Sequence, residues 1–156
     1  MTIFNIIKEK NIIKTSILTW QSATNNIINI NSEFSDSEKK CNYCVNFIPK
    51  NSEFLNLIGN SKTVAITTYN SYKDSSTIYI DIDYTRTIIN KDPKILQKIS
   101  IHEMGHAMGL IHGENGTVMS PMTNTASDSI TCKDLKNIFI AQNLIGDLNN
   151  QICNKN

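Results

Sequence analysis

The chain has 156 residues, of which 40% are hydrophobic, and its 15 basic and 14 acidic residues give a formal net charge of +1. This length predicts a single domain, residues 1–156, that can bury a core of its own. The balanced charge argues against nucleic acid or a charged membrane surface as a partner. No apolar run approaches the roughly 20 residues that span a bilayer. We expect a protein that binds neither nucleic acid nor membrane, and we expect it to be a monomer.

The N-terminal part of the chain predicts a strand followed by a helix. Residues 2–7 are apolar and rich in side chains that favour strands, which predicts a first strand. From about residue 9 to residue 24, the apolar side chains Ile13, Ile17 and Trp20 recur at helical spacing. We expect an amphipathic helix here that packs on the sheet, with Trp20 as its largest buried side chain.

Four short strands are expected in the middle of the chain. Residues 27–31 and 44–48 form short apolar runs, and residues 62–69 alternate between two faces. The alternation is cleaner in residues 77–83, where isoleucines face one way and tyrosine and aspartates face the other. The polar residues 70–76 predict a turn between the last two strands.

Two further helices are predicted after these strands. Asp92 and Pro93 mark the start of the first, because aspartate caps helices and proline is favoured at the first helical position. Thr131 and Asp134 predict a capping box at the start of the second helix, which we expect to stop at Gly146. The apolar side chains expected on the buried face of that helix are Leu135, Ile138, Phe139 and Ile145.

All three histidines of the chain lie between residues 102 and 112. His102 and His106 are four residues apart on a predicted helix, so both side chains can point at one metal ion from the same face. His112 can reach the same ion only if the helix stops and the chain turns back. Gly109 lies where that turn is needed, and glycine suits it because it lacks the Cβ that makes a positive φ costly. The spacing therefore predicts a metal site with three imidazole ligands.

The residue beside the first histidine makes this site look catalytic. Three protein ligands leave the fourth tetrahedral position of a zinc ion open, which is typical of catalytic sites. Glu103 can take a proton from a water that zinc acidifies, and can later pass it to a leaving amine. Two alternatives are histidines that serve packing only and a purely structural zinc. The structural zinc leaves Glu103 unexplained and lacks an evident fourth protein ligand.

Residues 102–112 resemble the extended zinc signature of the metzincin metallopeptidases, most like the matrixin catalytic domain. Residues 117–121 are similar to the methionine turn that lies beneath the metal in these enzymes, with Met119 followed two residues later by proline. Met122 is the competing methionine, but it lacks the following proline. The resemblance implies an α+β zincin fold: a twisted mixed sheet, an active-site helix and a C-terminal helix. It also implies an upper subdomain of about residues 1–109 and a small lower subdomain of about 110–156.

The resemblance implies a zinc-dependent endopeptidase with one catalytic Zn²⁺. In it, His102, His106 and His112 hold the metal and Glu103 is the general base. The alternative is a catalytically inactive metzincin-like module that binds proteins, although a pure binder has no use for Glu103. Effectors that cleave one narrow protein target are a special case of the same chemistry.

The chain departs from the matrixin pattern at two positions and in its histidine count. Gly113 follows the third histidine where matrixins usually carry serine, and Ser120 stands where many have tyrosine. Pro121 occupies the position at which some other metzincins carry a tyrosine linked to the metal. No histidine is left to bind the second, structural zinc of matrixins.

A metzincin-like fold implies that a protein or peptide substrate binds as an extended strand along an edge strand above the metal. Residues 77–83 are our candidate for that edge strand. Asp81 and Asp83 are candidates for a Ca²⁺ site, as similar acidic positions are in matrixins; the alternative is a solvated strand face. Residues 120–131 are expected to form the wall of the pocket for the residue after the scissile bond.

The four cysteines allow three complete pairings, and the sequence does not choose among them. An even count suits two disulfides in an exported protein, while free thiols, a structural metal site or a redox role for Cys41 and Cys44 are the alternatives. The N-terminal residues lack the order of a signal peptide. We expect a secreted, extracellular protein whose leader has been removed; the other interpretation is a protein not exported by that route. The cysteines are Cys41, Cys44, Cys132 and Cys153.

Overall fold

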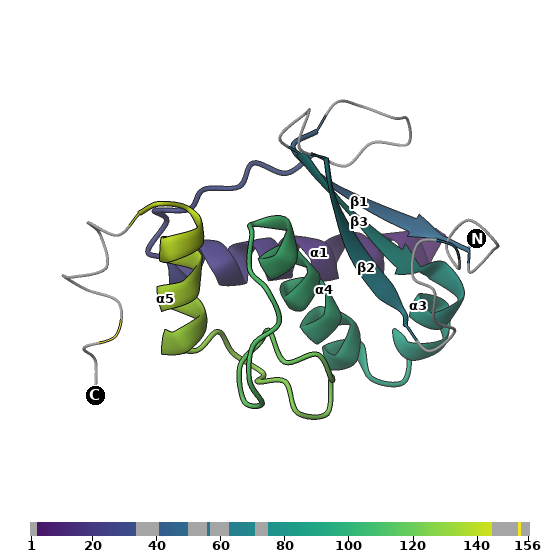
Figure 1. Ribbon diagram of the computed structural model, residues 1–156. Coiled ribbons are helices and arrows are strands. Elements are labelled where there is room, and N and C mark those ends of the chain that lie inside the picture. The colour runs from purple at the N-terminus through teal and green to yellow at the C-terminus, as the bar shows by residue number, and fades with distance from the viewer. Residues whose placement is uncertain are drawn as a thin grey trace.

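The computed structural model describes residues 3–33, 41–49, 56, 63–70, 75–144 and 153. Its helices and strands confirm the expected α+β class and form a three-stranded sheet with four helices around it (Figure 1). In chain order the elements are α1 (Ile3–Ala23), β1 (Tyr43–Ile48), β2 (Ala65–Asn70), β3 (Ser75–Asp81), α3 (Ile82–Ile88), α4 (Pro93–Ala107) and α5 (Cys132–Ala141).

The sheet is mixed, with strand order β1-β3-β2. β1 runs parallel to β3 with Val45 opposite Ile78, and β2 runs antiparallel to β3 with Thr67 opposite Ile78. The prediction that residues 77–83 form an edge strand is therefore wrong, because β3 is the middle strand. Alternation of apolar side chains shows which face of a strand is buried, as Ile78 and Ile80 are, but it does not show how many neighbours the strand has.

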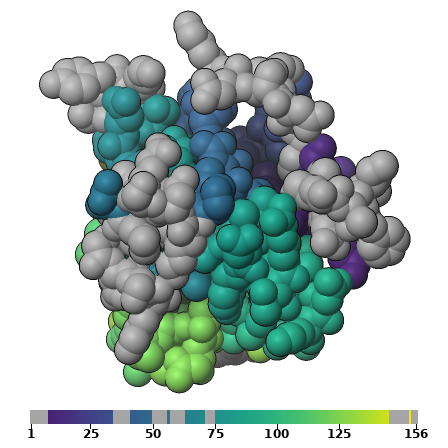
Figure 2. Space-filling view, turned by 90° about the vertical axis from the view of Figure 1, so that its right-hand side faces the viewer, coloured from purple at the N-terminus to yellow at the C-terminus, as the bar shows by residue number. Residues whose placement is uncertain are grey.

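The end of β3 also differs from the prediction. The strand stops at Asp81, whose carboxylate accepts hydrogen bonds from the N–H groups of Asp83 at 2.9 Å and Tyr84 at 3.1 Å. These bonds cap α3, so Ile82 and Asp83 are helical rather than extended. The local capping bonds of an aspartate outweigh the continued alternation of the sequence. Figure 2 shows the end of the molecule that α3 occupies, where its surface adjoins that of β1.

Two of the predicted strands in the N-terminal part of the chain are not formed, and helix α1 takes the place of the first. It already begins at Ile3, so the strand expected at residues 2–7 is wrong over the described residues, and the apolar spacing there continues the helical pattern. The strand expected at 27–31 is also wrong, since these residues form no regular element. Asn25 and Asn26 adopt positive φ angles of 51° and 61° and end the helix, and asparagine tolerates this conformation well.

The core lies between α1, α4 and the sheet (Figure 1). Trp20 of α1 is fully buried, as predicted, and its indole N–H donates a hydrogen bond of 3.0 Å to the carbonyl of Ile101 in α4. α4 also packs against β2 and β3. This central helix is therefore held on one side by α1 and on the other by the sheet, which makes it a rigid base for side chains. Among the described residues, no helix is long and apolar enough to cross a membrane.

The cysteines pair as Cys41–Cys44 and Cys132–Cys153. This confirms the disulfide interpretation. All four cysteines are described and none is a free thiol, so the alternatives of free thiols and of a cysteine metal site are wrong. The second disulfide joins residue 153 to the first turn of α5. That helix has the predicted capping box but ends at Ala141, before the predicted stop. Residues 145 and 146, on which that stop depended, lie outside the described residues.

Candidate metal centre

Helix α4 places the first two histidines, and its two ends are well defined by the sequence. Asp92 caps the start by accepting a hydrogen bond of 3.1 Å from the N–H of Lys94. At the other end, the N–H of Gly109 bonds to the His106 carbonyl and the N–H of Leu110 bonds to the Gly105 carbonyl, both at 2.9 Å. This pair of bonds is a Schellman motif.

The Schellman motif turns the chain where the sequence predicted that it must. Gly109 has a φ of +97°, in the left-handed region that penalises a Cβ. After this residue the chain leaves the helix axis and brings His112 back towards His102 and His106. The predicted turn at Gly109 is therefore confirmed, and it is the structural reason why three histidines from a helix and a loop can meet.

The three imidazoles converge on one point. Their ring centroids lie 4.7 Å apart for His102 and His106, 4.8 Å for His106 and His112, and 5.3 Å for His102 and His112. One nitrogen of each ring lies within 4.8 Å of those of the other two. Within the described part of the chain, this is the only group of three or more side chains that could hold a metal ion.

Hydrogen bonds to the main chain fix the tautomers of two of these rings. Nδ1 of His102 lies 2.9 Å from the carbonyl oxygen of Val118, and Nδ1 of His106 lies 2.7 Å from that of Leu110. A carbonyl can only accept, so each Nδ1 carries the proton and donates. In the neutral ring, Nε2 then keeps the lone pair that a metal needs.

Burial also favours the neutral forms of His102 and His112. It is the main reason why the pKa of His102 is lowered to about 4, with smaller contributions from the neighbouring His106 and His112, while the Val118 carbonyl and Asp134 act in the opposite direction. Burial likewise lowers the pKa of His112, helped by His106. Three imidazoles without a fourth protein ligand among the described residues are a donor set that fits a zinc ion with one open position.

Glu103 lies beside the first histidine and is almost fully buried, with 7% of its surface exposed. Burial raises the pKa of its carboxyl group, while a hydrogen bond from Thr67 and the charge of His112 act in the opposite direction. The Thr67 hydroxyl, on β2, donates to Glu103 Oε2 across 2.6 Å. Sequence reasoning did not find Thr67, because its partner is 36 residues away and no local pattern marks the pair.

Met119 lies under the helix that carries the histidines. It is 2% exposed, and a Cβ added to Gly105 of α4 would overlap with the Met119 sulfur. Glycine at position 105 is therefore what allows the loop to approach the helix this closely. Met122, the competing methionine, is 60% exposed and has no comparable packing.

The glycine that departs from the matrixin pattern has a steric explanation. The N–H of Gly113 donates to the Met119 carbonyl at 2.8 Å. A Cβ at position 113 would lie 2.7 Å from Thr117 Oγ1 and 3.3 Å from Met119 Cβ. Thr117 occupies the space that a larger residue at 113 would need. Ser120, the second departure, is buried and its hydroxyl lies 2.6 Å from that of Thr125.

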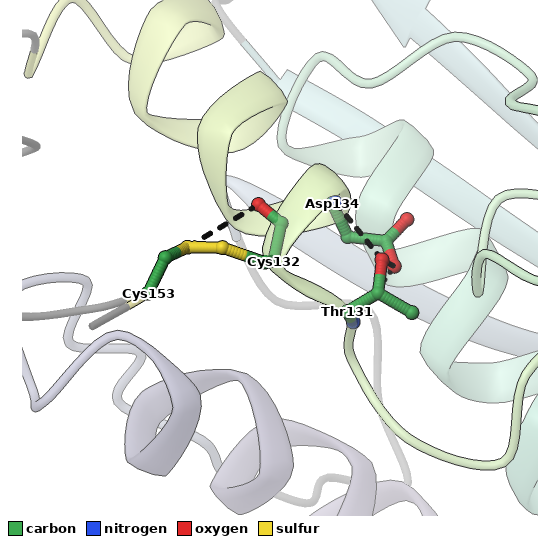
Figure 3. The surroundings of a disulfide bond; sticks show 4 residues. All are labelled: Thr131, Cys132, Asp134 and Cys153. Atoms are coloured by element: carbon green, nitrogen blue, oxygen red, sulfur yellow. Dashed lines mark hydrogen bonds between the residues drawn. A yellow bond between two sulfur atoms is a disulfide. The ribbon is translucent and has the colours of Figure 1, made fainter. Parts of the chain in front are cut away.

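Asp134 is a second residue whose contact with the site the sequence did not reveal. The capping box predicts that its carboxylate accepts a hydrogen bond from the Thr131 N–H, at 2.9 Å, and the Thr131 hydroxyl also donates to this carboxylate, at 2.6 Å (Figure 3). The same carboxylate oxygen also accepts from the N–H of Val118 at 3.2 Å. The start of α5 is thus hydrogen-bonded to Val118, the loop residue whose carbonyl orients His102. Figure 3 shows that the Cys132–Cys153 disulfide adjoins this cap.

The acidic residues proposed for calcium do not form such a group. The Asp81 carboxylate caps α3, and Asp83 lies 3.4 Å from Arg86 in an exposed ion pair. Neither belongs to a cluster of three possible ligands among the described residues. The expected Ca²⁺ site therefore has no support in this part of the chain.

Comparison with known proteins agrees with the sequence resemblance. The family model described as Matrixin matches residues 2–140. This range contains all three histidines, Glu103, Met119 and Asp134. No curated protein and no solved structure matches the chain.

Proposed function

The chain belongs to the matrixin family, and on this premise we propose that it is a zinc-dependent endopeptidase that hydrolyses peptide bonds in protein substrates. The observation that supports this most strongly is the convergence of three imidazoles beside the buried carboxylate of Glu103. A metal site with an open position and an adjacent carboxylate has the two parts that hydrolysis by an activated water requires.

We assign the metal to His102, His106 and His112, with Met119 packed beneath. The Nε2 atoms of the first two rings are the ligating atoms, since their Nδ1 atoms bond to main-chain carbonyls. Zinc bound there would acidify a water molecule and polarise the scissile carbonyl. The protein's own contribution is to hold two of the rings on a rigid helix and the third on the loop that follows Gly109.

Glu103 is assigned the role of general base. Its carboxylate takes a proton from the attacking water and then delivers it to the nitrogen of the leaving amine. The raised pKa of this buried group supports the role, because a carboxylate with a raised pKa is a stronger base towards the attacking water.

We propose that the substrate binds as an extended strand along β2. This strand pairs with β3 on one side, and no described strand pairs with its other side. Main-chain bonds to the edge strand of a sheet give affinity that depends little on sequence. The substrate would then lie between an upper subdomain of about residues 1–109 and a lower one of about 110–156, with residues 120–131 lining the pocket after the scissile bond.

The two disulfides support the proposal that the protein acts outside the cell, where such bonds persist. We propose a secreted monomer. Catalytic activity, rather than binding alone, is the part of this proposal that an experiment must decide first.

The test is cleavage of a peptide library by the zinc-loaded protein, with and without a chelator. We expect cleavage that the chelator abolishes. Glu103→Gln keeps the shape of the side chain but removes the base, so its kcat should fall by at least about a hundredfold while one zinc per chain remains bound. Cleavage that survives in Glu103→Gln would refute the mechanism. Zinc-dependent peptide binding without cleavage would favour the inactive binding module.

A further inference from the structure

Thr67 is the only described residue whose side chain hydrogen-bonds to the Glu103 carboxylate. Its Oγ1 lies 2.6 Å from Glu103 Oε2 and 3.1 Å from the main-chain oxygen of the same residue. The shorter distance lies in the range of a strong hydrogen bond from a hydroxyl to a charged carboxylate. One side chain on the sheet thus contacts both the carboxylate and the backbone of the proposed general base.

We infer that Thr67 is a positioning residue that fixes the orientation of the Glu103 carboxylate. This inference rests on the proposed function, because it gives Thr67 a part in the work of the general base. A glutamate side chain has several rotatable bonds, and misplacing a reacting group by about 1 Å can lower a rate by about a hundredfold. The Thr67 hydroxyl donates to a lone pair of Oε2. Oε1 is then the carboxylate oxygen that accepts the proton of the water.

The backbone around Thr67 makes it a firm support. Thr67 lies in the middle of β2, opposite Ile78 of the central strand, and Ile78 is 2% exposed. Threonine is β-branched, so its χ1 angle is restricted once the backbone is extended. A substrate that pairs with β2 would hold the same stretch of backbone. Substrate binding and orientation of the base are therefore coupled through one residue.

The same hydroxyl suits both protonation states through which the base must pass. A hydroxyl has one proton to donate and two lone pairs to accept. When Glu103 is ionised, the Thr67 hydroxyl donates to Oε2. When Glu103 holds the proton from the water on Oε1, its Oε2 is still an acceptor for the same hydroxyl, and the Glu103 main-chain oxygen at 3.1 Å is a second acceptor. Serine preserves both arrangements, and valine removes both with little change of shape.

The experiment compares Thr67→Val with Thr67→Ser, and uses Thr85→Val, on α3, as a control that also removes a threonine hydroxyl. Thr85 is buried and its hydroxyl donates to the Asp81 carbonyl at 2.8 Å. With the zinc-loaded enzyme and a library-selected peptide, Thr67→Val should lower kcat by about tenfold to a hundredfold, the range for losing one hydrogen bond to a charged group. KM and zinc affinity should stay near wild-type values, and Thr67→Ser and Thr85→Val should retain most of kcat.

Crystal structures of the same variants give a measurement that does not need turnover. We expect one Glu103 conformer in the wild type and in Thr67→Ser, and a displaced or multiple conformer in Thr67→Val. An unmoved Glu103 in Thr67→Val would overturn the inference even if the wild type cleaved no peptide, which by itself would refute only the proposed function. Wild-type kcat in Thr67→Val, an equal loss in Thr85→Val, or a parallel loss of zinc affinity would also overturn it.

Discussion

Asp134 accepts a hydrogen bond from the peptide N–H of Val118, and the carbonyl of Val118 accepts one from the ring of His102. A single loop residue thus joins the first turn of α5 to the first imidazole of the proposed metal site. Asp134 as a whole is 1% exposed. A buried group that orients a metal ligand through one peptide is expected to affect both folding and metal binding.

Replacing Asp134 should test this connection. Asp134→Ala leaves the buried N–H of Val118 without its acceptor, which is expected to lower the free energy of unfolding by about 1–3 kcal/mol. Loss of an outer contact to a metal ligand should also weaken zinc binding by about tenfold to a hundredfold. Chemical denaturation and competition with a chromophoric chelator measure the two effects.

Thr131→Ala is the matched control for Asp134→Ala. It removes the hydroxyl that caps α5 but leaves the Val118 contact in place, so it should cost about 1 kcal/mol and leave zinc affinity unchanged. Equal zinc affinities for Asp134→Ala and the wild type would show that the Val118 peptide does not carry the effect.

The two glycines with positive φ make a second matched pair. Gly109 has a φ of +97° and Gly116 a φ of +86°, and a Cβ at either position meets no atom closer than 3.6 Å. Alanine at either position should therefore destabilise the fold by backbone strain alone, by roughly 1–2 kcal/mol. Only Gly109→Ala should also weaken zinc binding, because Gly109 makes the turn that returns His112 to the site. Isothermal titration calorimetry with zinc measures the affinity of both variants, and equal zinc affinities would contradict this role for the turn.

Stability of the metal-free protein should depend on pH through His102. Burial holds the pKa of its folded form near 4, against 6.5 for an ordinary imidazole. The unfolded chain therefore takes up this proton first as the pH falls. The contribution of His102 to stability is complete above pH 6.5 and is lost as the pH falls from there towards 4. The raised pKa of Glu103 acts in the opposite direction, since the folded form takes up that proton more readily.

NMR titration in the presence of a chelator measures this prediction directly. The ring signals of His102 should show no titration between about pH 7 and pH 5, because the imidazole stays neutral over that range. In denaturation experiments, a His102→Gln variant should lose less stability than the wild type over the same range. A His102 ring that titrates at the ordinary value would contradict the predicted neutral site.

The disulfides should differ in how much they stabilise the fold. Cys132–Cys153 closes a loop with a sequence separation of 21, and Cys41–Cys44 one of 3. The entropy of the unfolded chain then predicts a loss of about 3 kcal/mol for the Cys132→Ser/Cys153→Ser variant and roughly half of that for Cys41→Ser/Cys44→Ser. Thermal unfolding of both variants measures the difference. The reverse order would show that strain or residual structure outweighs loop closure.

Several features of the site follow from residues that are close in sequence. The helix start at Asp92, the turn at Gly109 and the capping box at Thr131 were all predictable and are all present. Such features depend on local backbone geometry, which a few neighbouring residues determine. The convergence of three histidines follows from the same local geometry, because a helix and one sharp turn suffice to bring them together.

The tertiary structure decided the relationships between distant residues. Alternation predicted β3 as a strand but could not show that it lies between β1 and β2, and the expected edge strand proved to be the central one. The contacts of Glu103 with Thr67 and of Val118 with Asp134 span 36 and 16 residues. No sequence period reports such pairs, because they depend on how whole elements pack against one another. The sequence by itself thus determined the proposed metal ligands and the base, and the packing of β2 and α5 against α4 and its loop determined what orients them.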